Sequence, residues 1–177
     1  MVRHRSPLVK DALKKIKVVA MDLDGVLTDG RIIIDSNGVE TKNFDVQDGF
    51  GIVFLRKCAI KTAIISARAS GVIAHRAKDL KIDKVYVGVY PKLSAYESML
   101  EEFKVLDEEV CFIGDDLADL SVMRRCGVGV AVANAVLEVK QIADYVTVRQ
   151  GGRGAVREVV ELILQAQGHW GPQLYEH

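Results

Sequence analysis

Several side chains that could act on a phosphate group follow short apolar runs in this sequence. They are Asp22, Asp24, Ser66, Lys92, Asp115, Asp116 and Asp119. Carboxylates gathered at one place repel one another unless a cation lies among them, and Mg²⁺ is a cation that prefers oxygen ligands. The residue types therefore predict a magnesium site that holds a phosphate ester.

Each of these residue types has its own task in phosphoryl transfer. The Asp22 carboxylate can attack phosphorus and form an aspartyl-phosphate. Asp24 can protonate the leaving alcohol and later take a proton from the water that hydrolyses the intermediate. Ser66 can donate a hydrogen bond to a phosphoryl oxygen, and Lys92 can neutralise charge on the nucleophile and the phosphate. Asp115 would complete the metal site.

Asp116 and Asp119 have two interpretations. Either residue can orient the metal ligands and the lysine without binding the metal itself. Asp119 can instead be an acid in the first turn of a helix, where the helix dipole favours a negative charge. Ser66 can likewise be only a hydroxyl that begins a helix, although its place at a strand end favours contact with phosphate.

Apolar runs alternate with amphipathic segments, and this alternation predicts the elements that position the candidate residues. The expected strands are Val18–Met21, Thr62–Ile65, Lys84–Val87, Val110–Ile113, Val128–Ala131 and Tyr145–Val148. The expected helices are Phe50–Cys58, Ser70–Leu80, Leu93–Phe103, Asp119–Cys126, Val136–Ile142 and Ala155–Gln167. The pattern predicts an α/β fold, a doubly wound parallel sheet whose strands are buried on both faces. Ligands bind beyond the carboxyl ends of such strands, so we expect the candidate residues at one edge.

One segment interrupts this alternation. Two extended runs, Arg31–Asp35 and Val39–Phe44, flank Asn37 and Gly38, a pair typical of tight hairpin turns. We expect a small β-hairpin insertion over about residues 31–45 that projects from the mouth of the sheet. The intervals before and after Ser66 are too short for a separate helical cap domain. Exclusion of water from the site would therefore depend on another subunit.

The length, charge and cysteine content of the chain indicate its domain number, its partners and its location. The chain has 177 residues, and we expect a single domain over residues 1–177 with a tail over about 168–177. It has 24 Lys and Arg against 24 Asp and Glu, so the positive field that attracts nucleic acid or anionic lipid is missing, and we expect neither partner. Residues 1–15 are basic but lack the apolar core of a secretory signal, which predicts a cytoplasmic protein. The three cysteines, Cys58, Cys111 and Cys126, are expected to be reduced thiols.

The order of these motifs resembles the haloacid dehalogenase superfamily of phosphatases. The matching parts are Asp22–Gly30, Ser66 after an apolar run, Lys92, and Gly-Asp-Asp-x-x-Asp at Gly114–Asp119. The resemblance extends from about residue 17 to residue 168. The hairpin, the Asp48–Ile52 segment and the Gly151–Glu158 segment are more specific, and they resemble capless members that hydrolyse 3-deoxy-D-manno-octulosonate 8-phosphate.

The resemblance implies an activity and further site residues. The implied reaction is Mg²⁺-dependent hydrolysis of that sugar phosphate, in lipopolysaccharide precursor synthesis, through an aspartyl-phosphate. Asp22, Asp115 and the backbone carbonyl of Asp24 would bind Mg²⁺. Substrate contacts are implied for Asp24, Asp45, Val46, Gln47, Asp48, Gly49, Arg68, Arg76 and Lys92. The family also implies a homotetramer in which the hairpins pack together and the C-terminal segment of one subunit reaches the neighbouring active site.

Several residues have a simpler interpretation beside the implied one. Arg68 and Arg76 could be solvated surface charges. The Gly151–Gly154 segment could be only a flexible entry to the last helix. Trp170 and Tyr175 could be a packing or interface anchor, or belong to a disordered terminus.

Three positions depart from the family pattern and leave a second substrate open. Gln47 and Val53 stand where many members have basic residues, and Ala67 replaces a common glycine. The first two positions lie near the expected substrate loop, so the sugar carboxylate could be held differently. A related nine-carbon keto-acid phosphate is therefore the alternative substrate.

Two alternatives from other classes also remain. A phospho-accepting receiver domain places carboxylates, a hydroxyl and a lysine around Mg²⁺ as well. Receivers have the acidic pair first and the lysine last, whereas here Lys92 precedes Asp115 and Asp116. A non-catalytic scaffold that keeps only the fold is disfavoured because the motif residues are intact.

Overall fold

A computed structural model describes residues 7–176. The expected single domain over residues 1–177 and the basic segment over residues 1–15 therefore lie partly outside the described residues. The main strands are β1 (Val18–Met21), β4 (Lys61–Ser66), β5 (Lys84–Val87), β6 (Val110–Gly114), β7 (Val128–Ala131) and β8 (Tyr145–Val146). They form one sheet in the order β5-β4-β1-β6-β7-β8, and every neighbouring pair is parallel.

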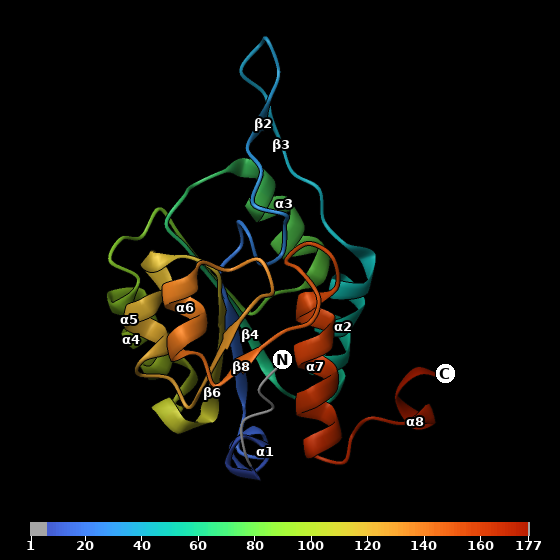
Figure 1. Ribbon diagram of the computed structural model, residues 1–177. Coiled ribbons are helices and arrows are strands. Elements are labelled where there is room, and N and C mark those ends of the chain that lie inside the picture. Colours follow the sequence, from blue (N-terminus) through green and yellow to red (C-terminus); the bar gives the residue numbers. More distant parts are fainter. Residues whose placement is uncertain (1–6, 177) are drawn as a thin grey trace.

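Helices cover both faces of this sheet. They are α1 (Pro7–Leu13), α2 (Val46–Lys57), α3 (Gly71–Leu80), α4 (Leu93–Phe103), α5 (Leu120–Met123), α6 (Leu137–Ile142), α7 (Ala155–Ala166) and α8 (Pro172–Tyr175), with 3-10 turns at Asp107–Glu109 and Leu117–Asp119. α4, α5 and α6 lie on one side of the sheet, and α2 and α7 lie on the other (Figure 1). This arrangement confirms the expected doubly wound α/β fold. None of the helices within residues 7–176 is long and apolar enough to cross a membrane.

The register brings the ends of the central strands together. Met21 at the end of β1 pairs with Ile64 of β4 and with Ile113 of β6. The residues that follow these three strands therefore meet at one edge, as the sequence predicts.

The edge strands differ from the prediction of strands buried on both faces. That prediction is confirmed for β1 and β7, but Val85 and Val87 of β5 are exposed because no further strand or full helix layer covers this edge. β8 ends at Val146 rather than Val148, because the Glu158 carboxylate accepts the backbone N–H groups of residues 148 and 149 at 2.9 Å.

Several helix boundaries also differ from the prediction. α2 begins at Val46 rather than Phe50 because the Asp45 carboxylate accepts a hydrogen bond from the backbone N–H of Gln47 at 2.6 Å and caps the helix. The segment expected as a helix over Asp119–Cys126 contains only the four residues of α5 after a 3-10 turn. The short helices α1 and α8 were not expected from the sequence.

The expected hairpin is present between β1 and α2. Its strands, β2 (Ile33–Ile34) and β3 (Glu40–Thr41), pair antiparallel and extend away from the body of the molecule (Figure 1). The Asp35 carboxylate accepts the backbone N–H groups of Asn37 and Val39, and Gly38 adopts a φ of +77° that permits the turn. Only the hairpin and α2 lie between β1 and β4, and only α3 lies between β4 and β5, so no separate cap domain is present within residues 7–176.

The C-terminal tail packs on its own chain. The Trp170 ring meets Phe54 of α2 edge to face, with 5.7 Å between ring centroids. Leu174 is buried, and its carbonyl accepts a hydrogen bond from Lys57 Nζ at 3.0 Å. Trp170 therefore anchors the tail by packing against α2.

Candidate active site

A buried lysine links two aspartates at the carboxyl edge of the sheet. Lys92 Nζ, just before α4, lies 2.9 Å from Asp22 Oδ2 and 2.7 Å from Asp119 Oδ1. The Lys92 side chain is 1% exposed and that of Asp119 is fully buried. An ion pair removed from water in this way depends on close contact with both partners, so the position of Lys92 is tightly determined.

Asp119 also fixes the loop after β6. Its second oxygen, Oδ2, accepts the backbone N–H groups of Asp115 at 2.9 Å and Asp116 at 3.2 Å. A side chain at Gly114 would place its Cβ 2.6 Å from the Asp119 Cβ, so this close approach requires glycine. The geometry favours the interpretation of Asp119 as support for the lysine and for the neighbouring aspartates.

The acidic group at this edge has the donor set of a site for a hard cation. Ligand atoms of Asp22, Asp115 and Asp119 all lie within 4.8 Å of one another. Both oxygens of Asp119 have partners, and so do those of Asp22, whose Oδ1 accepts the Leu23 N–H at 2.6 Å and whose Oδ2 faces Lys92. Asp115 Oδ1 is buried and has no hydrogen-bond partner among the described residues. These oxygen ligands fit Mg²⁺.

The pKa values of Asp22 and Asp115 are both raised at this edge. Burial and the nearby carboxylates, Asp22 first, raise the pKa of Asp115 to about 8. Burial raises the pKa of Asp22 to about 6 although Lys92 acts in the opposite direction. Burial alone would lower the pKa of Lys92, but Asp22 and Asp119 outweigh that effect and raise it. One lysine therefore does not balance this cluster, and a divalent cation would.

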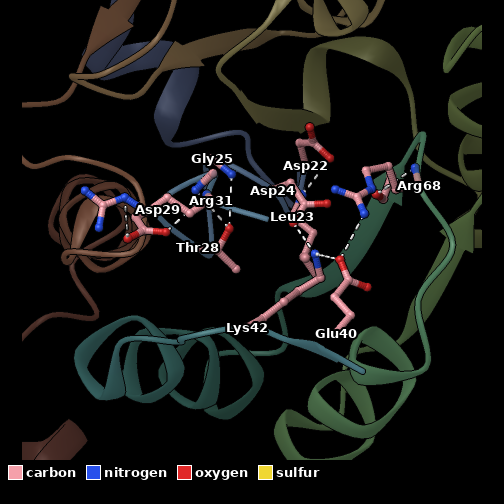
Figure 2. Close-up of polar contacts among 12 residues, drawn as sticks. Asp22, Leu23, Asp24, Gly25, Thr28, Asp29, Arg31, Glu40, Lys42 and Arg68 are labelled. Carbon is pink, nitrogen blue, oxygen red and sulfur yellow. Dashed lines mark hydrogen bonds and ion pairs between the residues drawn. The ribbon is translucent and has the colours of Figure 1, made fainter. Parts of the chain in front are cut away.

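The loop after β1 is shaped to bring Asp22 and Asp24 to the same edge. The buried Thr28 hydroxyl oxygen accepts the backbone N–H groups of Gly25 and Gly30 at 3.2 Å each (Figure 2). Gly25 has a φ of +90°, and a Cβ there would lie 2.0 Å from Asp115 Oδ2. Only glycine therefore allows this loop to approach Asp115 so closely.

Asp24 pairs with a lysine of the hairpin. Lys42 Nζ lies 2.5 Å from Asp24 Oδ1 and 3.1 Å from Glu40 Oε1, and Arg68 Nη2 lies 2.9 Å from the same Glu40 oxygen. Figure 2 shows these four side chains linked one to the next by their contacts. These contacts connect the loop after β1 with the loop after β4 through the hairpin.

A cavity of about 260 Å³ opens between these strand ends. Its lining residues are Asp22, Asp24, Gly30, Ile32, Ser66, Ala67, Arg68, Lys92, Asp115, Asp116 and Ala118. The buried Ser66 side chain ends β4, and its Oγ accepts the backbone N–H of Arg68 at 3.3 Å. The structure thus brings the predicted catalytic residues, the predicted metal ligands and Arg68 to one cavity.

Comparison with known proteins identifies the family. The haloacid dehalogenase-like hydrolase family profile matches residues 82–159. The 3-deoxy-D-manno-octulosonate 8-phosphate phosphatase of Salmonella typhimurium is 44% identical over 163 residues, which cover 92% of this chain and 87% of that protein. The chain belongs to the haloacid dehalogenase-like hydrolases.

Solved structures agree with this assignment. The structure of the same phosphatase from Yersinia pestis has a TM-score of 0.91 at 42% identity, and the match covers 93% of this chain and 89% of that one. The Moraxella catarrhalis phosphatase, solved with a magnesium ion, a phosphate ion and KDO, also has a TM-score of 0.91 at 42% identity, with 93% and 94% covered. These matches confirm the predicted family and fold.

Other predicted substrate residues of this hydrolase lie outside the main cavity. Asp45 lines a second cavity of about 200 Å³ together with Asp29, Asn43, Phe44, Gly152 and Arg153. Val46 is 73% exposed at the start of α2. Asp48 is buried, and its carboxylate accepts the backbone N–H groups of Gly154 at 3.2 Å and Arg157 at 2.8 Å, so it ties α2 to α7.

Arg76 and Gln47 have partners within the chain. Arg76 Nη1 lies 2.6 Å from Asp79 Oδ2, and its guanidinium carbon lies 5.3 Å from the centre of the Phe44 ring. A Cβ at Gly49 would lie 2.7 Å from Arg76 Nη2, so Gly49 makes room for this side chain. Gln47 Oε1 accepts a hydrogen bond from Arg149 Nη1 at 2.8 Å, which places a guanidinium beside position 47.

Sequence reasoning missed three residues of this hydrolase that contact the site loops. Lys42 and Glu40 alternate on the second run of the hairpin, and this period of two could have placed both side chains on one face. Asn134 donates to the Gly25 carbonyl at 3.4 Å and accepts the Gly151 N–H at 2.7 Å, so it joins two loops that lie far apart in the sequence. No sequence signal indicated that contact.

Proposed function

We propose that the protein hydrolyses 3-deoxy-D-manno-octulosonate 8-phosphate to KDO and phosphate, with Mg²⁺ as cofactor. The observation that supports phosphoryl transfer most strongly is Lys92, buried between Asp22 and Asp119 next to Asp115. The substrate follows from relatives that are named for this reaction and are 42–44% identical over most of both chains.

The chain's own residues account for each step of the reaction. Asp22 attacks phosphorus and forms an aspartyl-phosphate, while Lys92 holds the Asp22 carboxylate and offsets the phosphate charge. Asp24 gives its proton to the leaving alcohol oxygen, and then takes a proton from the water that attacks the intermediate. Asp22, Asp115 and the Asp24 carbonyl would hold Mg²⁺, which when bound supplies charge neutralisation and orients the phosphate. Ser66 donates to a phosphoryl oxygen.

The remaining contacts would hold the sugar. Arg68 stands at the rim of the main cavity, and Asp45 lines the second cavity beside Gly152 and Arg153. We propose that the sugar acid extends between these two cavities, with Arg76 and Gln47 near its path.

Phosphate release in the presence of Mg²⁺ tests this function. The substrates are the eight-carbon ester and its nine-carbon relatives, and the variants are Asp22→Asn and, as a matched control on α1, Asp11→Asn, which removes an exposed carboxylate. We expect a higher kcat/KM for the eight-carbon ester, loss of turnover in Asp22→Asn and with EDTA, and unchanged turnover in Asp11→Asn.

Other outcomes would redirect the proposal. A higher kcat/KM for a nine-carbon ester would keep the mechanism and replace the substrate. A phosphorylated protein that persists for many minutes would instead indicate a receiver-like signalling domain, and the absence of release from every ester would leave a scaffold.

We also propose that residues 1–177 act as one domain in a cytoplasmic homotetramer. The hairpin supports assembly, because Ile32 and Ile34 are each 59% exposed on it and would be covered by a second copy. The resemblance also implies that the C-terminal segment reaches the neighbouring active site, but within one chain Trp170 packs on Phe54 and the Leu174 carbonyl binds Lys57. Light scattering should give four times the chain mass, and a monomer at working concentration would contradict the assembly.

A further inference from the structure

Lys42 is a buried cation at the end of the hairpin that the reaction steps above do not use. Its side chain is 1% exposed, and it does not line the main cavity. Its ammonium contacts Asp24 Oδ1 at 2.5 Å and Glu40 Oε1 at 3.1 Å (Figure 2). Lys42 can therefore influence the reaction only through these carboxylates, above all through Asp24.

This contact distinguishes the two oxygens of Asp24. An ammonium group has three donors and no acceptor, so the oxygen that faces it must accept a hydrogen bond and cannot itself donate one to it. Asp24 Oδ1 is held in this way, whereas Oδ2 has no hydrogen-bond partner among the described residues. Oδ2 is thus the oxygen left to hold a transferable proton.

We propose that Lys42 is a positioning residue for protonation of the leaving group. By holding Oδ1, it keeps the Asp24 carboxyl in one orientation and reserves Oδ2 for the proton. When an Asp22 oxygen bonds to phosphorus, the bond between phosphorus and the ester oxygen breaks, and the Oδ2 proton moves to that oxygen. The inference rests on the proposed function, because it refines one step of the same reaction.

Glu40 fixes Lys42 in turn. Glu40 and Lys42 are two residues apart in and just after β3, so both side chains lie on the same face of the hairpin. Glu40 Oε1 accepts from both Lys42 and Arg68, which holds the hairpin against the loop after β4. The orientation of Asp24 is therefore set by a residue of the inserted hairpin rather than by the sheet alone.

This proposal is tested with two phosphate esters whose leaving groups differ in their need for a proton. A sugar alkoxide leaves only when it is protonated, whereas p-nitrophenolate leaves without a proton. The comparison uses kcat/KM, which includes the steps up to departure of the leaving group and excludes later hydrolysis of the phosphoenzyme. In Lys42→Met, we expect a loss of about 100-fold with the eight-carbon sugar phosphate and of less than about fivefold with p-nitrophenyl phosphate.

Further variants keep the test independent of folding. Lys42→Met/Glu40→Gln removes the cation together with one of its carboxylates, so it leaves less unbalanced charge, and it should show the same difference between esters. Lys42→Arg keeps a cation without an acceptor and should recover much of the activity on the sugar phosphate. Lys14→Met just after α1, which removes an exposed lysine, is the matched control and should change neither value.

The outcomes separate this inference from the proposed function. Equal losses with both esters, or a loss that follows a weaker Mg²⁺ affinity, would overturn the role of Lys42 and leave the proposed function intact. Wild-type protein that releases phosphate from neither ester would overturn the proposed function and this inference with it.

Discussion

Lysine–carboxylate pairs occur at both ends of the sheet, but they differ in burial. At the carboxyl ends of the strands, the side chains of Lys92 and Lys42 are each 1% exposed. At the opposite end, Lys17 pairs with Glu109 while its own side chain is 65% exposed. Exposed pairs contribute little to stability, whereas a buried charge that loses its partner is costly. Burial of the pair, rather than pairing alone, therefore distinguishes the candidate active site.

Cavity size does not distinguish the two ends. A cavity of about 430 Å³ lies at the end opposite the site, lined in part by Lys14, Lys15 and Lys17. These lysines are all more than half exposed, so water screens them. The smaller cavity at the carboxyl ends contains the buried charges, and we assign the chemistry to it.

Replacing one lysine at each end of the sheet tests this comparison. Of the predictions made here, it has the largest expected effect on turnover and stability. Lys92→Met leaves Asp22, Asp115 and Asp119 without their cation, so we expect turnover to fall by about 1,000-fold and the free energy of unfolding in EDTA to fall by about 3–5 kcal/mol. Lys17→Met should leave both the turnover and the free energy of unfolding unchanged. Phosphate release and denaturant unfolding measure the two effects, and similar results for both variants would remove the distinction.

The dependence of Mg²⁺ binding on pH has a smaller expected effect. The pKa values of Asp115 and Asp22 are raised to about 8 and about 6, so protons compete with the metal at neutral pH. Calorimetry should show the Mg²⁺ dissociation constant rising about tenfold per unit as pH falls from 8 to 6.

The free energy of unfolding of the metal-free protein should increase as pH falls, whereas the Mg²⁺ affinity should decrease. Because these raised values make the folded state bind protons more tightly than the unfolded state, the apoprotein should become more stable as pH falls below 8. By contrast, the hydrogen bond from Lys17 lowers the pKa of Glu109. The Lys17–Glu109 pair therefore loses its contribution to folding stability only in acid. A metal affinity that is constant between pH 6 and 8 would contradict the charge balance inferred for the site.

The tail gives the smallest expected effect on activity. Trp170 packs against both Phe54 and the Arg157 guanidinium, whose carbon lies 5.0 Å from the Trp170 ring centre. Trp170→Ala should lower the free energy of unfolding by about 1–2 kcal/mol and leave kcat/KM within about twofold. A large loss of activity that depends on protein concentration would instead favour insertion of the tail into a neighbouring site.

The sequence predicts the sheet and the catalytic edge because both depend on local patterns. Apolar runs such as Val18–Met21 become central strands, and parallel strands bring the residues after them to one edge. Asp22, Asp24, Ser66, Lys92 and Asp115 accordingly meet around one cavity.

Other features depend on contacts between distant segments, and the sequence did not reveal them. Val148 is lost from β8 because the carboxylate of Glu158, ten residues further along the chain, takes its N–H. The pairing of Lys42 with Asp24 spans 18 residues and requires the hairpin to fold over the loop after β1. Asp48 likewise finds its partners more than 100 residues away. Such contacts are set by tertiary packing, which periodicity and motif spacing do not encode.

Trapping the phosphoenzyme tests the central claim most directly. Wild-type protein and Asp22→Asn would be mixed with the eight-carbon sugar phosphate and Mg²⁺, quenched in acid within milliseconds and examined by peptide mass spectrometry. The account predicts one phosphoryl group on the peptide that contains Asp22 in the wild type and none in the variant. Rapid release of phosphate with no phosphorylated protein at any time, or a phosphoryl group on another residue, would contradict it.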